Sequence, residues 1–149
     1  MWTLYGDTRE KQMLDIKPGS NISSFVVQKL PFGDYAAKLD GSNNFLPVFW
    51  ERKSLADLWG TLTTGMDRFK AEVARAKESN VTLYLGIEAS MTDVYKGFDR
   101  SDVLGSQIIR TLYTFKTKYG VEPVFCNSRD ELKYHVIETY DALDRNYAG

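Results

Sequence analysis

Residues 81–88 (VTLYLGIE) constrain the fold of this chain more than any other stretch. They are almost continuously apolar and form the clearest strand signal in the sequence. A strand with one solvent-exposed face alternates polar and apolar residues, whereas a strand that is buried on both faces is apolar throughout. The stretch therefore predicts an interior strand of a sheet with helices packed against both faces.

The flanking segments indicate the order of the other elements. Further strands are expected at residues 2–6, 25–30, 34–39, 45–53 and 121–126. Helices are expected at residues 54–60, extending at most to 65, and at 67–79, 101–119 and 128–145. Strands come first, and helices and strands then alternate, which predicts an α/β fold with a mixed sheet and helices on both faces.

Length and composition narrow the class of protein. At 149 residues we expect a single domain over residues 1–149 with a substantial core. No apolar run approaches the roughly 20 residues that span a bilayer, and no signal peptide is recognisable. The single cysteine, Cys126, fits a reducing compartment, so we expect a soluble, cytoplasmic protein that does not bind membranes. Because the net charge is −1, binding to nucleic acid would require a local basic patch, metal ions or a partner protein.

The stretch FWERKSLAD at residues 49–57 combines a strand end with charged side chains. Glu51 and Lys53 are two positions apart and point to one face of a strand, while Arg52 points to the other. An acid beside an amine at a strand end can hold a metal ion next to a phosphate. The alternative from these residues alone is a solvated surface ion pair.

A second acid is expected beside this strand end. Asp34 opens the strand that precedes the one closed by Glu51, and antiparallel pairing across the intervening loop would make the two side chains neighbours. Adjacent carboxylates repel each other unless a cation lies between them. Oxygen ligands suit Mg²⁺ or Mn²⁺, and Lys53 could then orient a water or stabilise developing charge.

Three motifs occur in order along the chain. They are Asp7-x-Arg9-Glu10, Leu30-Pro31-x-Gly33-Asp34-Tyr35 and Glu51-Arg52-Lys53-Ser54-x-x-Asp57-Leu58. Together they resemble the nuclease domain of the XPF-type structure-specific endonucleases, within the restriction-endonuclease-like PD-(D/E)xK superfamily. The resemblance implies the restriction-endonuclease-like fold and a metal-dependent DNA endonuclease. It also implies branched or flapped DNA as the substrate, in repair, recombination or replication.

The same resemblance implies roles for particular residues. Asp34 and Glu51 would hold Mg²⁺ or Mn²⁺ with Asp7 contributing nearby, Lys53 would be the catalytic lysine, and Arg52 would belong to the catalytic set.

Further motif positions are expected to support this site. Arg9 and Glu10 are expected to form an ion pair that organises it, while Asp57 either supports catalysis or only caps a helix. The residues expected to contact DNA lie on the 67–79 helix, where a solvated face is the alternative: Arg68, Lys70 and Lys77.

Some features depart from the family pattern. Relatives that cut branched DNA usually carry a helix-hairpin-helix module, and some carry a helicase domain, whereas residues 1–149 contain neither. A DNA-binding or helicase partner is therefore expected, in a prokaryotic or phage-infected cell. The alternative function is a non-catalytic dimerisation or DNA-docking module, although an inactive module is expected to lose motif residues that this chain retains. The apolar side chains of the 101–119 helix, with Ile137, Tyr140 and Leu143, predict a homodimer.

Overall fold

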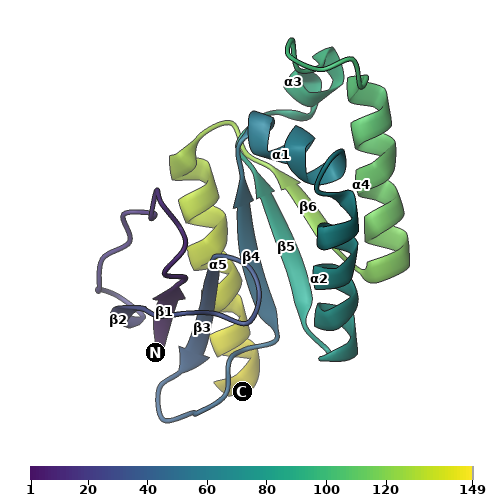
Figure 1. Ribbon diagram of the computed structural model, residues 1–149. Coiled ribbons are helices and arrows are strands. Elements are labelled where there is room, and N and C mark those ends of the chain that lie inside the picture. The colour runs from purple at the N-terminus through teal and green to yellow at the C-terminus, as the bar shows by residue number, and fades with distance from the viewer. Residues whose placement is uncertain (149) are drawn as a thin grey trace.

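A six-stranded mixed sheet lies at the centre of the computed structural model, which describes residues 1–148 (Figure 1). The strands are β1 (Trp2–Gly6), β2 (Ile22–Val27), β3 (Tyr35–Leu39), β4 (Val48–Lys53), β5 (Thr82–Ile87) and β6 (Glu122–Phe125). The helices are α1 (Leu55–Leu62), α2 (Met66–Glu78), α3 (Met91–Lys96), α4 (Gly105–Tyr119) and α5 (Arg129–Ala148). The predicted α/β class with a mixed sheet is confirmed. None of the helices in these residues is long and apolar enough to cross a membrane.

The sheet has the strand order β2-β1-β3-β4-β5-β6. β1 pairs with β2 in parallel and with β3 antiparallel, β3 pairs antiparallel with β4, and β4, β5 and β6 are parallel. β5 therefore has a neighbour on each side, as its apolar sequence predicted. Because β4 and β5 are parallel, their carboxyl ends meet at one edge of the sheet, where α1 begins.

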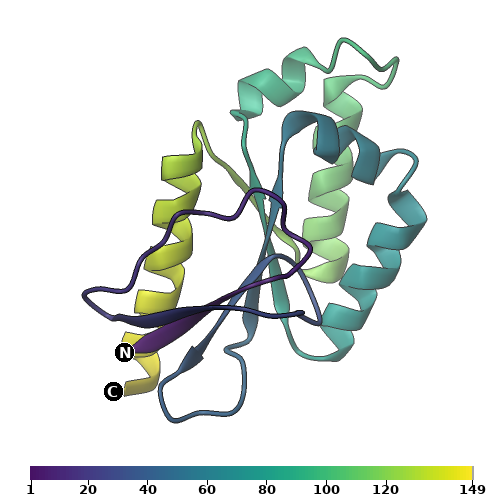
Figure 2. The same cartoon turned by 60° about the vertical axis from the view of Figure 1, so that its left-hand side comes forward.

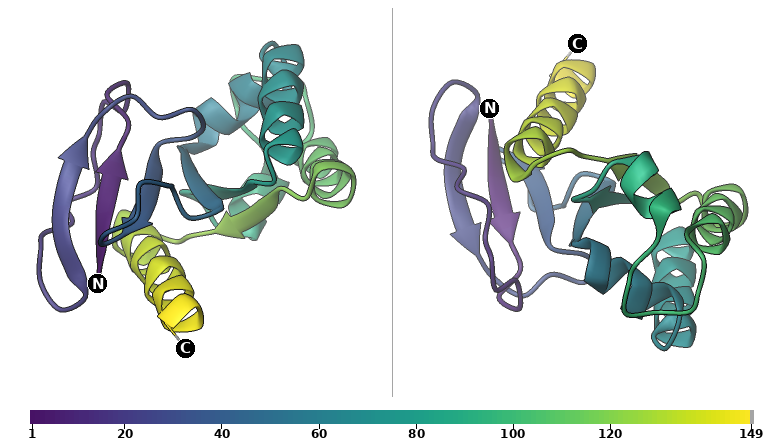
Figure 3. Two further views of the ribbon diagram at one scale, coloured as in Figure 1. Left: turned by 90° about the horizontal axis from the view of Figure 1, so that it is seen from below. Right: turned by 90° about the horizontal axis from the view of Figure 1, so that it is seen from above.

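Helices cover the two faces of this sheet unequally. α5 lies on one face, and α1, α2 and α4 lie on the other (Figure 3). β4 serves both layers, since Phe49 belongs to the core under α1 and α2 while Trp50 belongs to the core under α5. Period-two alternation along β4 then places Glu51 and Lys53 on the α2 side and Arg52 on the α5 side.

Several element boundaries differ from the sequence prediction. β2 begins at Ile22, and the long helix begins at Gly105 because the preceding residues form a loop after α3. α3 was not predicted. A Cβ atom at Gly105 would lie 2.1 Å from the carbonyl oxygen of Val94, so the absent side chain allows α3 and α4 to pack closely. A helix of six residues is too short to show a clear pattern of apolar residues, which is why the sequence did not predict α3.

Both ends of the chain lie at the same end of the molecule (Figure 2). The indole Nε1 of Trp2 donates to Asp141 at 2.8 Å, and the terminal amine lies 3.2 Å from Asp144. These contacts fix α5 against β1. The same contacts hold β1 in place, and the first motif begins at Asp7, directly after this strand.

The apolar surface expected for a homodimer is largely used within the protomer. Tyr140 is fully buried, and its hydroxyl donates to the carbonyl of Val48 at 2.8 Å, so its expected place on a dimer surface is wrong. The apolar surface of α4 is broad because this helix packs against α1, α2, α3 and β6. Leu104 and Tyr113 nevertheless remain more than half exposed, at 63% and 51%.

Gly33 determines how β3 approaches β4. Its φ is +61°, and a Cβ atom there would lie 2.7 Å from the carbonyl oxygen of Trp50. That same carbonyl accepts a hydrogen bond from the backbone N–H of Asp34 at 2.7 Å. A residue without a side chain is therefore needed directly before the first acid of the predicted site.

Replacing Gly33 with alanine is expected to lower the free energy of unfolding by about 2–5 kcal/mol, from left-handed backbone strain plus overpacking. The matched control is Gly41→Ala, where φ is +84° and nothing lies within 4 Å of the added Cβ. Strain alone should cost about 1–2 kcal/mol there. Urea unfolding of both variants measures the difference, and equal losses would show that the Trp50 carbonyl does not constrain this turn.

Candidate active site

Two hydrogen bonds donated by backbone N–H groups join the start of β3 to the end of β4. The N–H of Asp34 donates to Trp50, and the N–H of Arg52 donates to the Asp34 carboxylate at 2.7 Å. The Asp34 carboxylate therefore lies beside Glu51, the juxtaposition that antiparallel pairing predicted. One of its oxygens accepts from the β4 backbone, and the structure shows no hydrogen bond from the described residues to the other.

Glu51 and Lys53 share the face of β4 that α2 covers. The Nζ of Lys53 lies 3.5 Å from Oε2 of Glu51, and their side chains are only 20% and 10% exposed. An ion pair this shielded is not the solvated surface pair that the residues alone allowed. The structure thus brings Asp34, Glu51 and Lys53 together at one strand end.

Burial sets the electrostatics of the two acids. Desolvation raises the pKa of Asp34 to about 7, with the hydrogen bond from Arg52 opposing it and the charge of Glu51 adding to it. Desolvation is also the largest cause that raises the pKa of Glu51, and the negative charge of Glu72 raises it further. The positive charge of Lys53 lowers this pKa but offsets the increase only in part. Two carboxyl groups with raised pKa values side by side form a site that a divalent cation would stabilise.

The metal-free protein should therefore lose stability as pH rises. An aspartate has a pKa of about 3.9 in an unfolded chain, and that of Asp34 is about 7 in the folded one. Between these values the folded state binds more protons, so the free energy of unfolding should fall as pH increases from about 4 to beyond 7. Urea unfolding in EDTA between pH 5 and 8 measures this slope.

Asp34→Asn is the matched variant for that experiment, because an amide oxygen can still accept from the N–H of Arg52. The free energy of unfolding of this variant should fall less steeply with pH than that of the wild type. Adding Mn²⁺ to the wild-type protein should raise its free energy of unfolding most at high pH. An unchanged slope in Asp34→Asn would mean that this carboxyl group does not titrate in the native state as described.

Asp7 holds the first motif in place. Its side chain is 2% exposed, and its oxygens accept from the backbone N–H of Leu30 at 2.8 Å and from Nε of Arg9 at 2.7 Å. Burial raises the pKa of Asp7, but the hydrogen bonds from Arg9 and Leu30 outweigh burial and lower it. The backbone N–H of Asp7 donates to the carbonyl of Asp34 at 2.8 Å. Asp7 thus reaches the acid pair through the backbone, while its own oxygens are already hydrogen-bonded.

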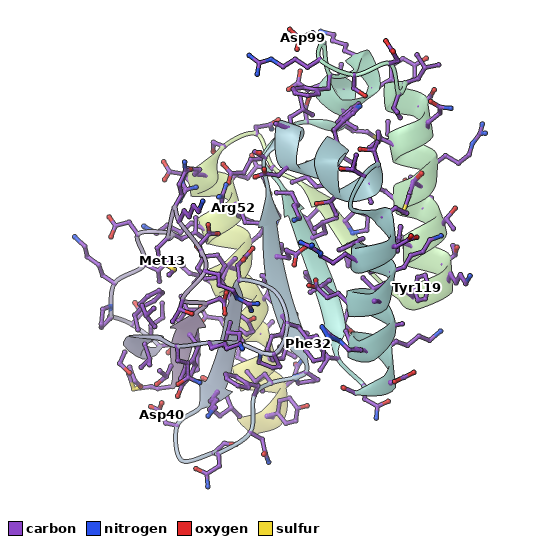
Figure 4. The ribbon with its side chains drawn as sticks, viewed as in Figure 1. Met13, Phe32, Asp40, Arg52, Asp99 and Tyr119 are labelled. Atoms are coloured by element: carbon purple, nitrogen blue, oxygen red, sulfur yellow. The ribbon has the colours of Figure 1, made fainter. Side chains whose placement is uncertain are left out.

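Arg52 lies on the opposite face from Glu51 and Lys53, at the end of β4 near α5 (Figure 4). Its side chain is 10% exposed, and the guanidinium group contacts Glu10 at 3.0 Å and Glu88 at 2.6 Å. The structure therefore does not bring this side chain to the acid pair. The predicted ion pair between Arg9 and Glu10 is wrong, because Glu10 binds Arg52 and Arg9 binds Asp7.

A cleft of about 380 Å³ opens between β4, α1 and α2 on the side of the acid pair. Its lining includes two site residues from β4, Glu51 and Lys53, and three charged residues from the helices: Asp57, Arg68 and Glu72. The side-chain oxygen of Ser54 accepts from the backbone N–H of Asp57 at 3.1 Å, so Ser54 caps α1. Asp57 itself is exposed and lines the cleft.

The predicted DNA-contacting residues divide between two surfaces. Arg68 lines the cleft, whereas Lys70 lines a separate hollow between α2 and α4. The Nζ of Lys77 donates to the carbonyl of Lys118 at the end of α4. Sequence reasoning missed Glu72, although it stands four positions after Arg68, and that spacing places both residues on one face of α2.

A different group of metal-ligating types lies near α5. Cys126, Glu131 and His135 offer ligand atoms within 4.8 Å of one another. Sulfur and imidazole ligands suit softer ions than the oxygen ligands at the end of β4 do. Desolvation raises the pKa of the Cys126 thiol to about 11. This fully buried sulfur therefore packs as an apolar group.

Comparisons with known proteins found a matching family model and solved structures that share the fold. The sequence model of the ERCC4 domain matches residues 7–138. Two solved structures share the fold at 20% identity: XPF from Aeropyrum pernix, with a TM-score of 0.64, and the same protein in complex with DNA, with a TM-score of 0.66. They match 96% and 97% of this chain, which spans 65% of the length of each. No curated protein matches the sequence.

Proposed function

This chain belongs to the ERCC4 domain family of DNA endonucleases, and we propose that it hydrolyses phosphodiester bonds in DNA with the help of a divalent metal ion. The observation that carries the proposal is the cluster of Asp34, Glu51 and Lys53 at the end of β4, of which Glu51 and Lys53 line a cleft. Such a cluster is costly to bury without a function that uses it.

Asp34 and Glu51 are the residues that would hold the ion. The raised pKa values of both carboxyl groups, and the buried Glu72 oxygen that has no hydrogen-bond partner in the same cleft, fit a site for Mg²⁺ or Mn²⁺. When bound, such an ion polarises a phosphoryl oxygen and makes a water more acidic.

The residues of this chain supply the remaining functions. The Lys53 ammonium group is placed to orient the attacking water or to stabilise negative charge on the phosphate. Asp7 and Gly33 position Asp34 through the backbone, and Arg52 holds the end of β4 from the opposite face. Arg68 faces the cleft, where it can contact a phosphate of the DNA.

Branched or flapped DNA is the substrate class that we propose. The structure of XPF in complex with DNA, which shares this fold, supports DNA binding. With a net charge of −1, phosphate contacts must come from local groups such as Arg68 and Lys70. A separate DNA-binding or helicase partner would supply the affinity that these few contacts do not.

A homodimer is a further part of the proposal. Leu104, at the N-terminus of α4, and Tyr113 on α4 are the apolar residues of the predicted surface that stay more than half exposed. Light scattering at micromolar concentration should give twice the mass of 17.0 kDa. A monomer at that concentration would contradict this part of the proposal and leave the catalytic part intact.

A cleavage assay tests the function directly. End-labelled flap, fork and linear duplex DNAs are incubated with the protein and Mg²⁺, Mn²⁺, Ca²⁺ or EDTA. We expect cleavage with Mg²⁺ or Mn²⁺, binding without turnover in Ca²⁺, and faster cleavage of branched substrates. DNA binding without cleavage of any substrate would favour the alternative, a non-catalytic docking module, provided that Mn²⁺ also fails to bind.

A further inference from the structure

Glu72 is an acidic residue that lies outside the three sequence motifs. It lies on α2 and lines the same cleft as Glu51 and Lys53. Its Oε1 atom is shielded from solvent and has no hydrogen-bond partner. A buried carboxylate oxygen without a partner is costly, so this atom needs a ligand that the protein itself does not provide.

The carboxyl group of Glu72 lies within hydrogen-bonding reach of that of Glu51. Two carboxylates offer each other acceptors and no donor, which explains why the Glu72 oxygen is left without a partner. The contact also fixes where a ligand would have to lie, since it must be close to Glu51 as well.

The nearby basic groups do not neutralise Glu72. Lys53 pairs with Glu51 at 3.5 Å, and Arg9 binds Asp7 at 2.7 Å. Glu72 itself takes part in no ion pair within residues 1–148. The cleft side of the site therefore carries more negative than positive charge, and an added cation would correct this imbalance.

We propose that Glu72 is a third carboxylate donor to the divalent cation that Asp34 and Glu51 hold. The inference rests on the proposed function, and it extends the metal site from the strand motifs to helix α2. Arg68 precedes Glu72 by one helical turn and lines the same cleft. α2 thus presents an acid to the metal and a base to the DNA phosphate from one face.

Mn²⁺ binding tests this inference without relying on activity. Isothermal titration calorimetry of the full chain compares the wild type with Glu72→Gln, Glu51→Gln and Glu78→Gln. Glu78 lies on the same helix and is exposed, so its variant is the matched control. Loss of the negative charge at this donor should weaken Mn²⁺ binding by about tenfold or more in Glu72→Gln. Glu51→Gln should lose more, and Glu78→Gln should match the wild type.

A second substitution separates loss of a donor from misfolding. Glu72→Ala should bind Mn²⁺ no more tightly than Glu72→Gln, because alanine also removes the donor oxygen, and both should retain the wild-type circular dichroism spectrum. Without metal, both variants should be at least as stable as the wild type, because each removes a negative charge beside Glu51.

The outcomes distinguish this inference from the proposed function. If both Glu72 variants bind Mn²⁺ like the wild type while Glu51→Gln does not, Glu72 is not a donor and the proposed function stands. If the wild-type chain binds no Mn²⁺ at all, the proposed function and this inference both fail.

Discussion

Replacing Glu51 with glutamine is expected to slow DNA cleavage by about a hundredfold to a thousandfold, the loss typical of removing one preorganised electrostatic group from an active site. Glutamine keeps the shape of the side chain but lacks the charge that attracts the cation. Single-turnover cleavage of a flap substrate in Mn²⁺ measures the loss. Lys53→Ala should be similarly slow, because it removes the ammonium group 3.5 Å from Glu51.

The stability of the Glu51→Gln variant gives the decisive control. In EDTA it should unfold at a denaturant concentration no lower than that of the wild type, since the raised pKa of Glu51 shows that its charged form is disfavoured by burial. The exposed pair of Lys116 and Glu122 supplies a matched surface variant, Lys116→Ala, which should cleave normally. Wild-type cleavage by either site variant would refute the site assignment.

Replacing Arg52 with alanine is expected to destabilise the protein by about 3–5 kcal/mol, because it leaves the shielded carboxylate of Glu10 without its ion-pair partner and leaves Glu88 with only Arg129, at 3.4 Å. Glu10 and Glu88 are only 6% and 16% exposed, and both contact the Arg52 guanidinium group. The melting temperature should fall by about 10 °C for a domain of this size. Arg52→Lys should recover only part of the lost stability, since one ammonium group cannot replace a planar guanidinium group that binds Glu10 and Glu88 at the same time.

The comparison that checks this prediction is again Lys116→Ala, whose pair with Glu122 is 44% and 41% exposed. Breaking such a pair should cost about 0.2–1 kcal/mol. Differential scanning calorimetry of both variants measures the contrast. If Arg52→Ala were as stable as the wild type yet unable to cleave DNA, Arg52 would act in the chemistry itself, contrary to its place on the α5 face.

The neighbouring positions of Asp34 and Glu51 could be derived from the sequence because the rules involved are short-ranged. Side chains two apart on a strand share a face, and a hairpin places the start of one strand beside the end of the next. These rules grouped Glu51 with Lys53 and separated Arg52 from both. Residues 81–88 likewise predicted an interior strand, since burial on both faces requires a continuously apolar sequence.

The partners of the buried charges were decided by the tertiary structure. Arg52 meets Glu10 from the segment after β1 and Glu88 from the end of β5, at separations of 42 and 36 residues. No local pattern specifies such pairs, which is why Glu10 was wrongly paired with Arg9. The place of Glu72 depends in the same way on how α2 packs over β4. The strand and helix periods determined which face each charged side chain points to. The packing of distant segments determined which charges meet there, because contacts between segments far apart in sequence depend on the whole fold.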